Sequence, residues 1–152
     1  MPKKQIRLGA FFIPFILLIS APVSAQGPGT AGTPPTVMDL VAEAKASVKS
    51  ISPAELKQAL DRKEAIVILD VRDPGEYAGG HLPGAVNISR GTLEFKVRDK
   101  LPDMEAKIIV YCLFVGRAAL AARTLQTLGY RNVALLDAPL QEWLQAGYPL
   151  EK

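Results

Sequence analysis

Apolar positions after residue 50 fall into short runs that alternate with stretches of helical spacing. The run 65–70, AIVILD, is continuous enough to be a central strand that is buried on both faces. Similar runs at 85–88, 108–111 and 133–136, with a short piece near Ile51, give five strands. Because helices separate the strands, right-handed crossovers place helices on both faces. The pattern therefore predicts an α/β fold with a five-stranded, mostly parallel sheet.

Two helices are predicted ahead of the first long strand. Residues 37–48 have apolar side chains at helical spacing, so the segment 37–50 is expected to form an amphipathic helix that packs on the domain or extends it. Ser52-Pro53-Ala54-Glu55 combines an N-cap, a proline at the first helical position and a capping-box glutamate. Residues 73–80 should form a turn and a short helix, and residues 140–146 the last helix. The main domain is predicted over residues 51–152.

The only cysteine lies between a strand and a helix. Residues 108–111 form the strand, Cys112 follows it, and from Arg117 Ala and Leu recur at helical spacing until Gly129, which suits a left-handed helix end. A loop that opens into a helix directs unpaired N–H groups and the positive end of the helix dipole at its occupant. This position favours a nucleophilic thiolate, with Arg117 adding positive charge. The alternative is an unreactive buried cysteine.

The first 25 residues read as a secretory signal peptide. Lys3, Lys4 and Arg7 form a basic region, residues 10–19 are apolar, and Val23-Ser24-Ala25 is a small-residue cleavage site. The apolar run is too short for a membrane anchor, so we expect cleavage after Ala25 and no stable membrane span afterwards; an uncleaved anchor is the alternative. The protein is expected to be exported, to the periplasm or the medium. Residues 26–36, rich in Gly, Pro and Thr, are predicted to be a flexible linker.

Removal of this leader changes the net charge of the chain and leaves its single cysteine in place. It holds three of the 18 basic residues and none of the 15 acidic ones, so the remaining chain has 15 of each. A formally neutral chain gives no reason to expect nucleic acid as a partner. One cysteine in an exported protein excludes an internal disulfide and leaves a reactive thiol or an intermolecular bridge. This strengthens the functional interpretation of Cys112.

Other polar residues lie at the same predicted sheet edge. Asp70 and Arg72 follow a parallel strand at its carboxyl end, as Cys112 does, and ligands collect at such edges. We expect an ion pair or hydrogen bonds from Asp70 and Arg72 to hold the loop, with direct catalysis as the alternative. His81 is the only histidine, and with one cysteine it supplies no recognisable metal-ligand set. No metal or cofactor is therefore expected; a Cys–His dyad remains an alternative.

Two segments, YCLFVGRAALAARTLQTLGY at 111–130 and LDVRDPGEYAGGHLPGAVNI at 69–88, resemble the rhodanese family of sulfurtransferases. With RGTLEF at 90–95 and EWLQAGYPLE at 142–151, the similarity covers residues 51–152. It implies a parallel α/β fold and a cysteine, Cys112, that carries sulfane sulfur as a persulfide. It also implies an architectural Gly-His turn at His81. The substrate would contact the loop residues Leu113, Phe114, Val115, Gly116 and Arg117, and Arg90 at the pocket mouth; the alternative for Arg90 is a solvated surface charge.

The sequence departs from the family pattern at two places. Val115 stands where the family usually has glycine, so either the loop takes a different path or Gly116 adopts the positive φ. Asp137 and Ala138-Pro139-Leu140 stand in the region of a Gly-Gly-Phe motif and bring a negative charge. These changes make the mouth more apolar. They disfavour thiosulfate and favour a larger thiol, an organic persulfide or a protein donor, or they mark a loop that has lost activity.

The sequence thus predicts a sulfurtransferase that passes sulfane sulfur through Cys112 to a thiol or cyanide. Its partners would be a small sulfur-containing substrate or thiol acceptor, or a protein sulfur donor or acceptor. One alternative is a catalytically weakened binding module. Another is a cysteine phosphatase or arsenate reductase, but those loops place five residues between cysteine and arginine, and here there are four.

Overall fold

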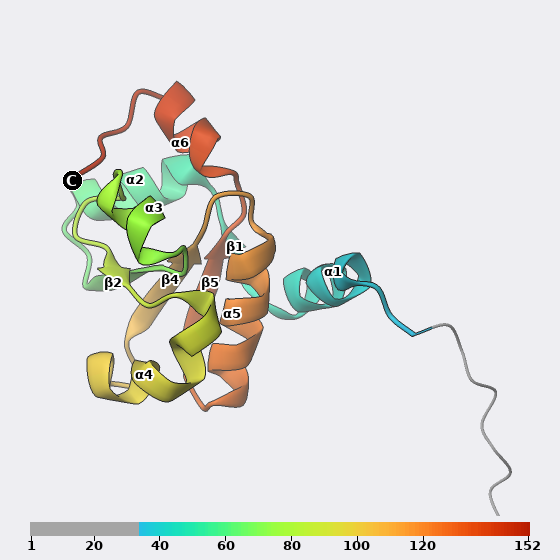
Figure 1. Ribbon diagram of the computed structural model, residues 1–152. Coiled ribbons are helices and arrows are strands. Elements are labelled where there is room, and N and C mark those ends of the chain that lie inside the picture. The colour runs from blue at the N-terminus through green and yellow to red at the C-terminus, as the bar shows by residue number, and fades with distance from the viewer. Residues whose placement is uncertain (1–33) are drawn as a thin grey trace, which may run out of the picture. The chain divides into compact units, whose positions relative to one another are not determined.

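A five-stranded parallel sheet forms the centre of the protein (Figure 1). The computed structural model describes residues 34–152. The strands lie in the order β1-β5-β4-β2-β3, and each named pair is parallel. The strand bounds are β1 Lys49–Ile51, β2 Ile66–Asp70, β3 Val86–Asn87, β4 Lys107–Tyr111 and β5 Asn132–Leu136. The predicted α/β class is confirmed, and the named strands are all parallel rather than mostly so.

Helices cover both faces of the sheet, as predicted. On one face the buried side chains come from α1 (Val37–Ser47), α4 (Leu93–Lys100) and α5 (Gly116–Thr127). On the other they come mainly from α2 (Pro53–Asp61) and α6 (Leu140–Gln145). The short elements α3 (Pro74–Ala78) and the 3₁₀ turn η1 (Arg90–Thr92) lie in the connections around β3.

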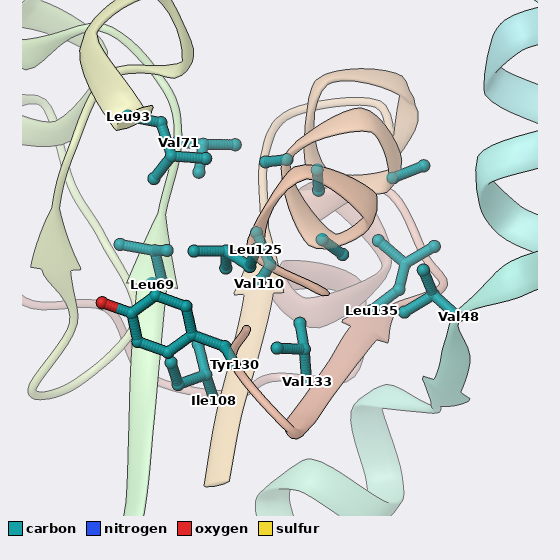
Figure 2. Close-up of a cluster of buried hydrophobic side chains, with 14 of the residues drawn as sticks. Val48, Leu69, Val71, Leu93, Ile108, Val110, Leu125, Tyr130, Val133 and Leu135 are labelled. Carbon is teal, nitrogen blue, oxygen red and sulfur yellow. The ribbon is translucent and has the colours of Figure 1, made fainter. Parts of the chain in front are cut away.

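The central strands supply side chains to both cores, which explains their continuous apolar sequence. Along β4, Ile108 and Val110 point to the α5 side, and Ile109 and Tyr111 to the α2 side. Figure 2 shows the α5 side, where Ile108 and Val110 pack with side chains of the neighbouring elements. Because strand side chains alternate with a period of two, the next residue on this side is Cys112. Strand register therefore directs the thiol towards α5.

Local sequence sets the helix ends. Ser52 Oγ accepts a hydrogen bond from Glu55 N at 3.2 Å, and Glu55 Oε2 accepts one from Ser52 N at 2.8 Å, which is the predicted capping box. Thr36 and Asp39 form the same box at the start of α1, at 3.2 and 2.8 Å. Gly129 follows α5 with φ of 98°. A glycine is the residue expected there, since a Cβ is strained at positive φ.

The predicted leader at residues 1–25, and the part of the predicted linker before Pro34, lie outside the described residues. Between residues 34 and 152, every helix is too short or too polar to cross a membrane.

Candidate active site

Cys112 lies at the end of β4, with 2% of its surface exposed, and faces the first turn of α5. Its Sγ accepts a hydrogen bond from the backbone N of Ala118 at 3.4 Å. Helix α5 begins at Gly116, and its N-cap residue Val115 offers no capping side chain. The cysteine sulfur thus takes the place of a capping oxygen for one of the otherwise unpaired N–H groups. The donor, Ala118, directly follows the segment from Leu113 to Arg117 that was expected to contact the substrate.

A cavity of about 560 Å³ opens next to the sulfur. Five of its lining residues belong to the segment predicted from the sequence, and three belong to α1. The lining residues are Met38, Val41, Lys45, Cys112, Phe114, Val115, Gly116 and Arg117. The contribution of α1 was not predicted, although its three residues are spaced by three and four positions, as one face of a helix requires.

Arg117 is held by carboxylates. Its Nη1 and Nη2 donate to the two carboxylate oxygens of Glu76 at 2.7 and 2.8 Å, and Asp73 Oδ2 lies 3.8 Å from Nη1. These bonds lower the pKa of Glu76 to about 2. They also raise the pKa of Arg117, to which the Cys112 sulfur adds a smaller electrostatic contribution. Arg117 thus lines the same cavity as the sulfur, while its guanidinium is already paired with Glu76.

Lys45, the second cation of the cavity wall, is also paired. Its Nζ lies 2.6 Å from Asp137 Oδ1, so an ion pair links α1 to the segment after β5. Asp137 was predicted to bring negative charge to the pocket. The structure shows that this carboxylate is matched by a lysine from α1, a partner that no local sequence pattern reveals.

Asp70 and Arg72 form a buried ion pair, with 0% and 4% of their surfaces exposed. Arg72 Nη2 lies 2.6 Å from Asp70 Oδ2 and donates to the carbonyl of Gly80 at 2.8 Å. Asp70 also accepts from the backbone N of Arg72 at 2.9 Å. Neither residue lines the cavity. Their contacts join the end of β2 to the turn at Gly80; that they support the loop after Cys112 stays a prediction.

Tyr111, the residue before the cysteine, extends this network. Its hydroxyl accepts a hydrogen bond from Leu82 N at 3.1 Å, and it pairs with Asp70 across β2 and β4. Burial, with Asp70 adding to it, raises the pKa of Tyr111 well above its usual value, so the hydroxyl stays neutral. The end of β4 is thereby anchored to the turn that contains Leu82.

Two residues expected to bind substrate lie elsewhere. Arg90 donates to Glu94 at 2.9 Å and to Thr124, in the third turn of α5, at 3.2 Å, and it does not line the cavity. Leu113 packs in the core on the α2 side, and its carbonyl accepts from Leu140 N at 3.1 Å. The period of two that directs Cys112 towards α5 sends the next side chain to the opposite face.

His81 stacks on Tyr77, with ring centroids 3.8 Å apart. Its backbone N donates to the Glu151 carbonyl at 2.9 Å, and the Glu151 N donates to its carbonyl at 2.8 Å. His81 does not line the cavity beside Cys112. These contacts join the turn after α3 to the end of the chain and fit the architectural role expected for this residue.

The model of the Rhodanese-like domain family matches residues 52–146. The chain belongs to the rhodanese-like domain family. It is 35% identical over 104 residues to the thiosulfate sulfurtransferase GlpE of Pseudomonas entomophila, covering 68% of this chain and 90% of that protein. It is 34% identical over 101 residues to the putative sulfur carrier protein YrkF of Bacillus subtilis, covering 66% of this chain and 54% of that protein. This chain thus spans about half the length of YrkF.

Solved structures extend the similarity beyond the family match. Protein RPA3614 of Rhodopseudomonas palustris, described as of unknown function and a possible tyrosine phosphatase, superposes with a TM-score of 0.70 at 30% identity, covering 79% of this chain and 100% of that one. The polysulfide-sulfur transferase homodimer of Wolinella succinogenes gives a TM-score of 0.64 at 31% identity, covering 74% and 84%.

The rhodanese-like loop places a β-branched residue in an unusual conformation. Val115 has φ of 76° and ψ of −41°, and Gly116 is not among the residues with positive φ. Of the two alternatives drawn from the sequence, the one in which Gly116 takes the positive φ is wrong. Val115 adopts it instead, directly before α5, and its side chain packs against the core on the α5 side. Such a conformation costs an L-residue about 1–2 kcal/mol.

Proposed function

We propose that this protein is a sulfurtransferase that moves sulfane sulfur to a thiol or cyanide through a persulfide on Cys112. The similarity to a thiosulfate sulfurtransferase, a putative sulfur carrier and a polysulfide-sulfur transferase supports this reaction class. The observation that carries the proposal is the position of the sulfur. Cys112 Sγ meets the Ala118 N–H at the start of α5 and borders a cavity large enough for a substrate.

The chemistry needs no oxidant or cofactor. The Cys112 thiolate attacks the sulfane sulfur of the donor, a new S–S bond forms at Sγ, and the donor's S–S bond breaks with its electron pair leaving on the departing group. The acceptor thiolate or cyanide then attacks the outer sulfur of the persulfide, and the thiolate is restored. The Ala118 N–H and the positive helix end stabilise the negative charge in both steps.

Cys112→Ser tests this function. Wild-type protein should transfer sulfur from a sulfane donor to a thiol or cyanide with double-displacement kinetics, and Cys112→Ser should lose the transfer while retaining the wild-type unfolding curve. The donors should include thiosulfate, polysulfide and glutathione persulfide. Equal rates for the two proteins, or no transfer from any donor, would reject the proposal; a protein that keeps a binding partner without any transfer is a binding module.

A phosphatase is the second candidate, because RPA3614 is described as a possible tyrosine phosphatase. Two features disfavour it: only four residues separate Cys112 from Arg117, and the arginine is bound by Glu76 rather than free for a phosphate. We expect no hydrolysis of an aryl phosphate. Hydrolysis that disappears in Cys112→Ser would favour the phosphatase instead.

We also propose export, on the basis of the predicted leader. The protein recovered from its native host should begin at Gln26 by intact mass and N-terminal sequencing. Recovery of the full-length chain from the soluble cytoplasmic fraction would contradict this proposal.

A further inference from the structure

Helix α1 lies outside the segment matched by the family model, yet it forms one wall of the cavity beside Cys112. Met38, Val41 and Lys45 face this cavity. Val41 packs directly over the loop, since a Cβ at Gly116 would lie 3.6 Å from Val41 Cγ2. The pocket of this protein is therefore completed by a helix added to the common domain.

The helix is attached to the domain through its middle and its C-terminal end. Ala44 and Val48 at its C-terminal end are buried in the core on the α5 side, and Glu43 pairs with Arg123 of α5 at 3.4 Å. Its N-terminus is closed by the Thr36 and Asp39 capping box. We treat α1 as a formed wall because its C-terminal half is buried against the domain and its middle is paired with α5, while the capping box stabilises its first turn.

The charges around the cavity do not favour a dianion. Both cations of its wall already bind carboxylates: Lys45 binds Asp137 at 2.6 Å, and Arg117 binds Glu76 at 2.7 and 2.8 Å. Asp73 lies 3.8 Å from the same arginine. A small dianion that bound Lys45 or Arg117 would have to displace these carboxylates. It would then lie near three negative side chains and only two positive ones.

The remaining surface of the cavity is apolar and adaptable. Met38 and Phe114 leave 69% and 76% of their surfaces exposed, and Val41 and Val115 line the same cavity. A methionine side chain adjusts to ligands of irregular shape. Large exposed apolar side chains beside a pocket indicate a surface that binds an apolar ligand. A volume of about 560 Å³ is typical of pockets for small organic ligands.

We propose that α1 makes this site selective for organic persulfides with an apolar carbon chain, and that Met38 and Val41 determine this selectivity. This inference rests on the proposed sulfurtransferase function. In the loading step, the Cys112 thiolate attacks the outer sulfur of R–S–SH, the Sγ–S bond forms, the donor S–S bond breaks, and R–S⁻ leaves. The proton stays on the transferred sulfur, so charge and atoms balance without a further reactant.

The test is the rate of Cys112 loading by alkyl persulfides of increasing chain length, with thiosulfate as the inorganic donor. The inductive effect changes little along the series, and each rate is divided by the rate of the same donor with a free low-molecular-weight thiol. Each added methylene should raise the normalised second-order rate about fourfold until the cavity is filled. Thiosulfate should load at least about tenfold more slowly than the best alkyl donor. A flat series, or thiosulfate as the fastest donor, would overturn the inference.

Variants of α1 distinguish an effect on donor selectivity from an effect on the sulfur-transfer reaction. Met38→Ala should flatten the chain-length dependence without unfolding the protein, because Met38 is largely exposed, and Val41→Ala should do so more strongly. Leu40→Ala is the matched control: this apolar residue lies on the same helix but lines a different hollow, against Leu120 and Arg123. Equal flattening by Leu40→Ala would contradict the role of Met38 and Val41.

A gain of function provides an independent check. Asp137→Asn leaves Lys45 without its carboxylate partner and should raise loading by thiosulfate several-fold relative to alkyl persulfides. An unchanged ratio would count against the electrostatic part of the inference. Loading from thiosulfate alone would refute the selectivity and leave the sulfurtransferase function standing, whereas no loading from any donor would refute that function itself.

Discussion

Glu76 binds Arg117 through two hydrogen bonds, of 2.7 and 2.8 Å, that join α3 to the first turn of α5. The arginine that follows Cys112 in the loop is thus held by a carboxylate 41 positions earlier in the chain. This pairing ties the start of α5 to α3 and matches the charge of one of the two cations that line the cavity beside the sulfur. It explains why a positively charged residue beside the cysteine does not by itself create a site for anions.

The Glu76 pair should appear in the pH dependence of stability. The pKa of Glu76 is lowered from 4.5 to about 2 by Arg117, so its contribution is complete above pH 4.5 and is lost as the pH falls towards 2. Wild-type protein should therefore lose more free energy of unfolding than Glu76→Gln across this interval. Chemical denaturation at closely spaced pH values measures the difference, and parallel curves for the two proteins would contradict the assigned partner.

The positive φ of Val115 predicts an unusual order of variant stabilities. Val115→Gly and Val115→Ala both remove the packed methyl groups, but only glycine relieves the strain at φ of 76°. Val115→Gly should therefore be more stable than Val115→Ala by about 1 kcal/mol, the reverse of the order in a strand or helix. Urea denaturation measures both. If the alanine variant were equally stable or more stable, the loop conformation described above would be wrong.

The buried Asp70–Arg72 pair should make the free energy of unfolding sensitive to neutralisation of either partner. Asp70→Asn leaves a buried guanidinium without its counter-charge, which should cost about 3 kcal/mol in the free energy of unfolding. Asp61→Asn is the control, since the Lys57–Asp61 pair at the surface of α2 should be worth less than about 1 kcal/mol. Comparable losses in both variants would show that the buried pair does not anchor the strand ends.

Sequence patterns predicted the parts of the site that depend on local structure. Apolar periodicity predicts the strand β4 and the helix α5, with Cys112 between them. Gly129 indicates where that helix ends. Other parts depend on tertiary packing. No local pattern indicates which surface α1 covers or that Lys45 meets Asp137, and steric rules argue against positive φ at Val115. The residues missed by sequence reasoning are therefore those that act across elements.

Arg90 shows that a motif can match a family while one of its side chains lies away from the site. The resemblance placed Arg90 at the pocket mouth, but in the structure it binds Glu94 and Thr124 beside α4 and α5. Glu94 lies four residues after Arg90, a spacing at which side chains on a helix meet, so this spacing is the signal that could have indicated the pair.

The most direct test of the central claim is the intermediate itself. Wild-type protein is incubated with a sulfane donor, freed of the excess, and analysed by intact-protein mass spectrometry and peptide mapping. We expect a mass increase of one sulfur atom, located on the peptide that contains Cys112, removed stoichiometrically by an added thiol and absent in Cys112→Ser. A protein that gains no sulfur from thiosulfate, polysulfide or organic persulfides, or that gains it equally in Cys112→Ser, would contradict the account.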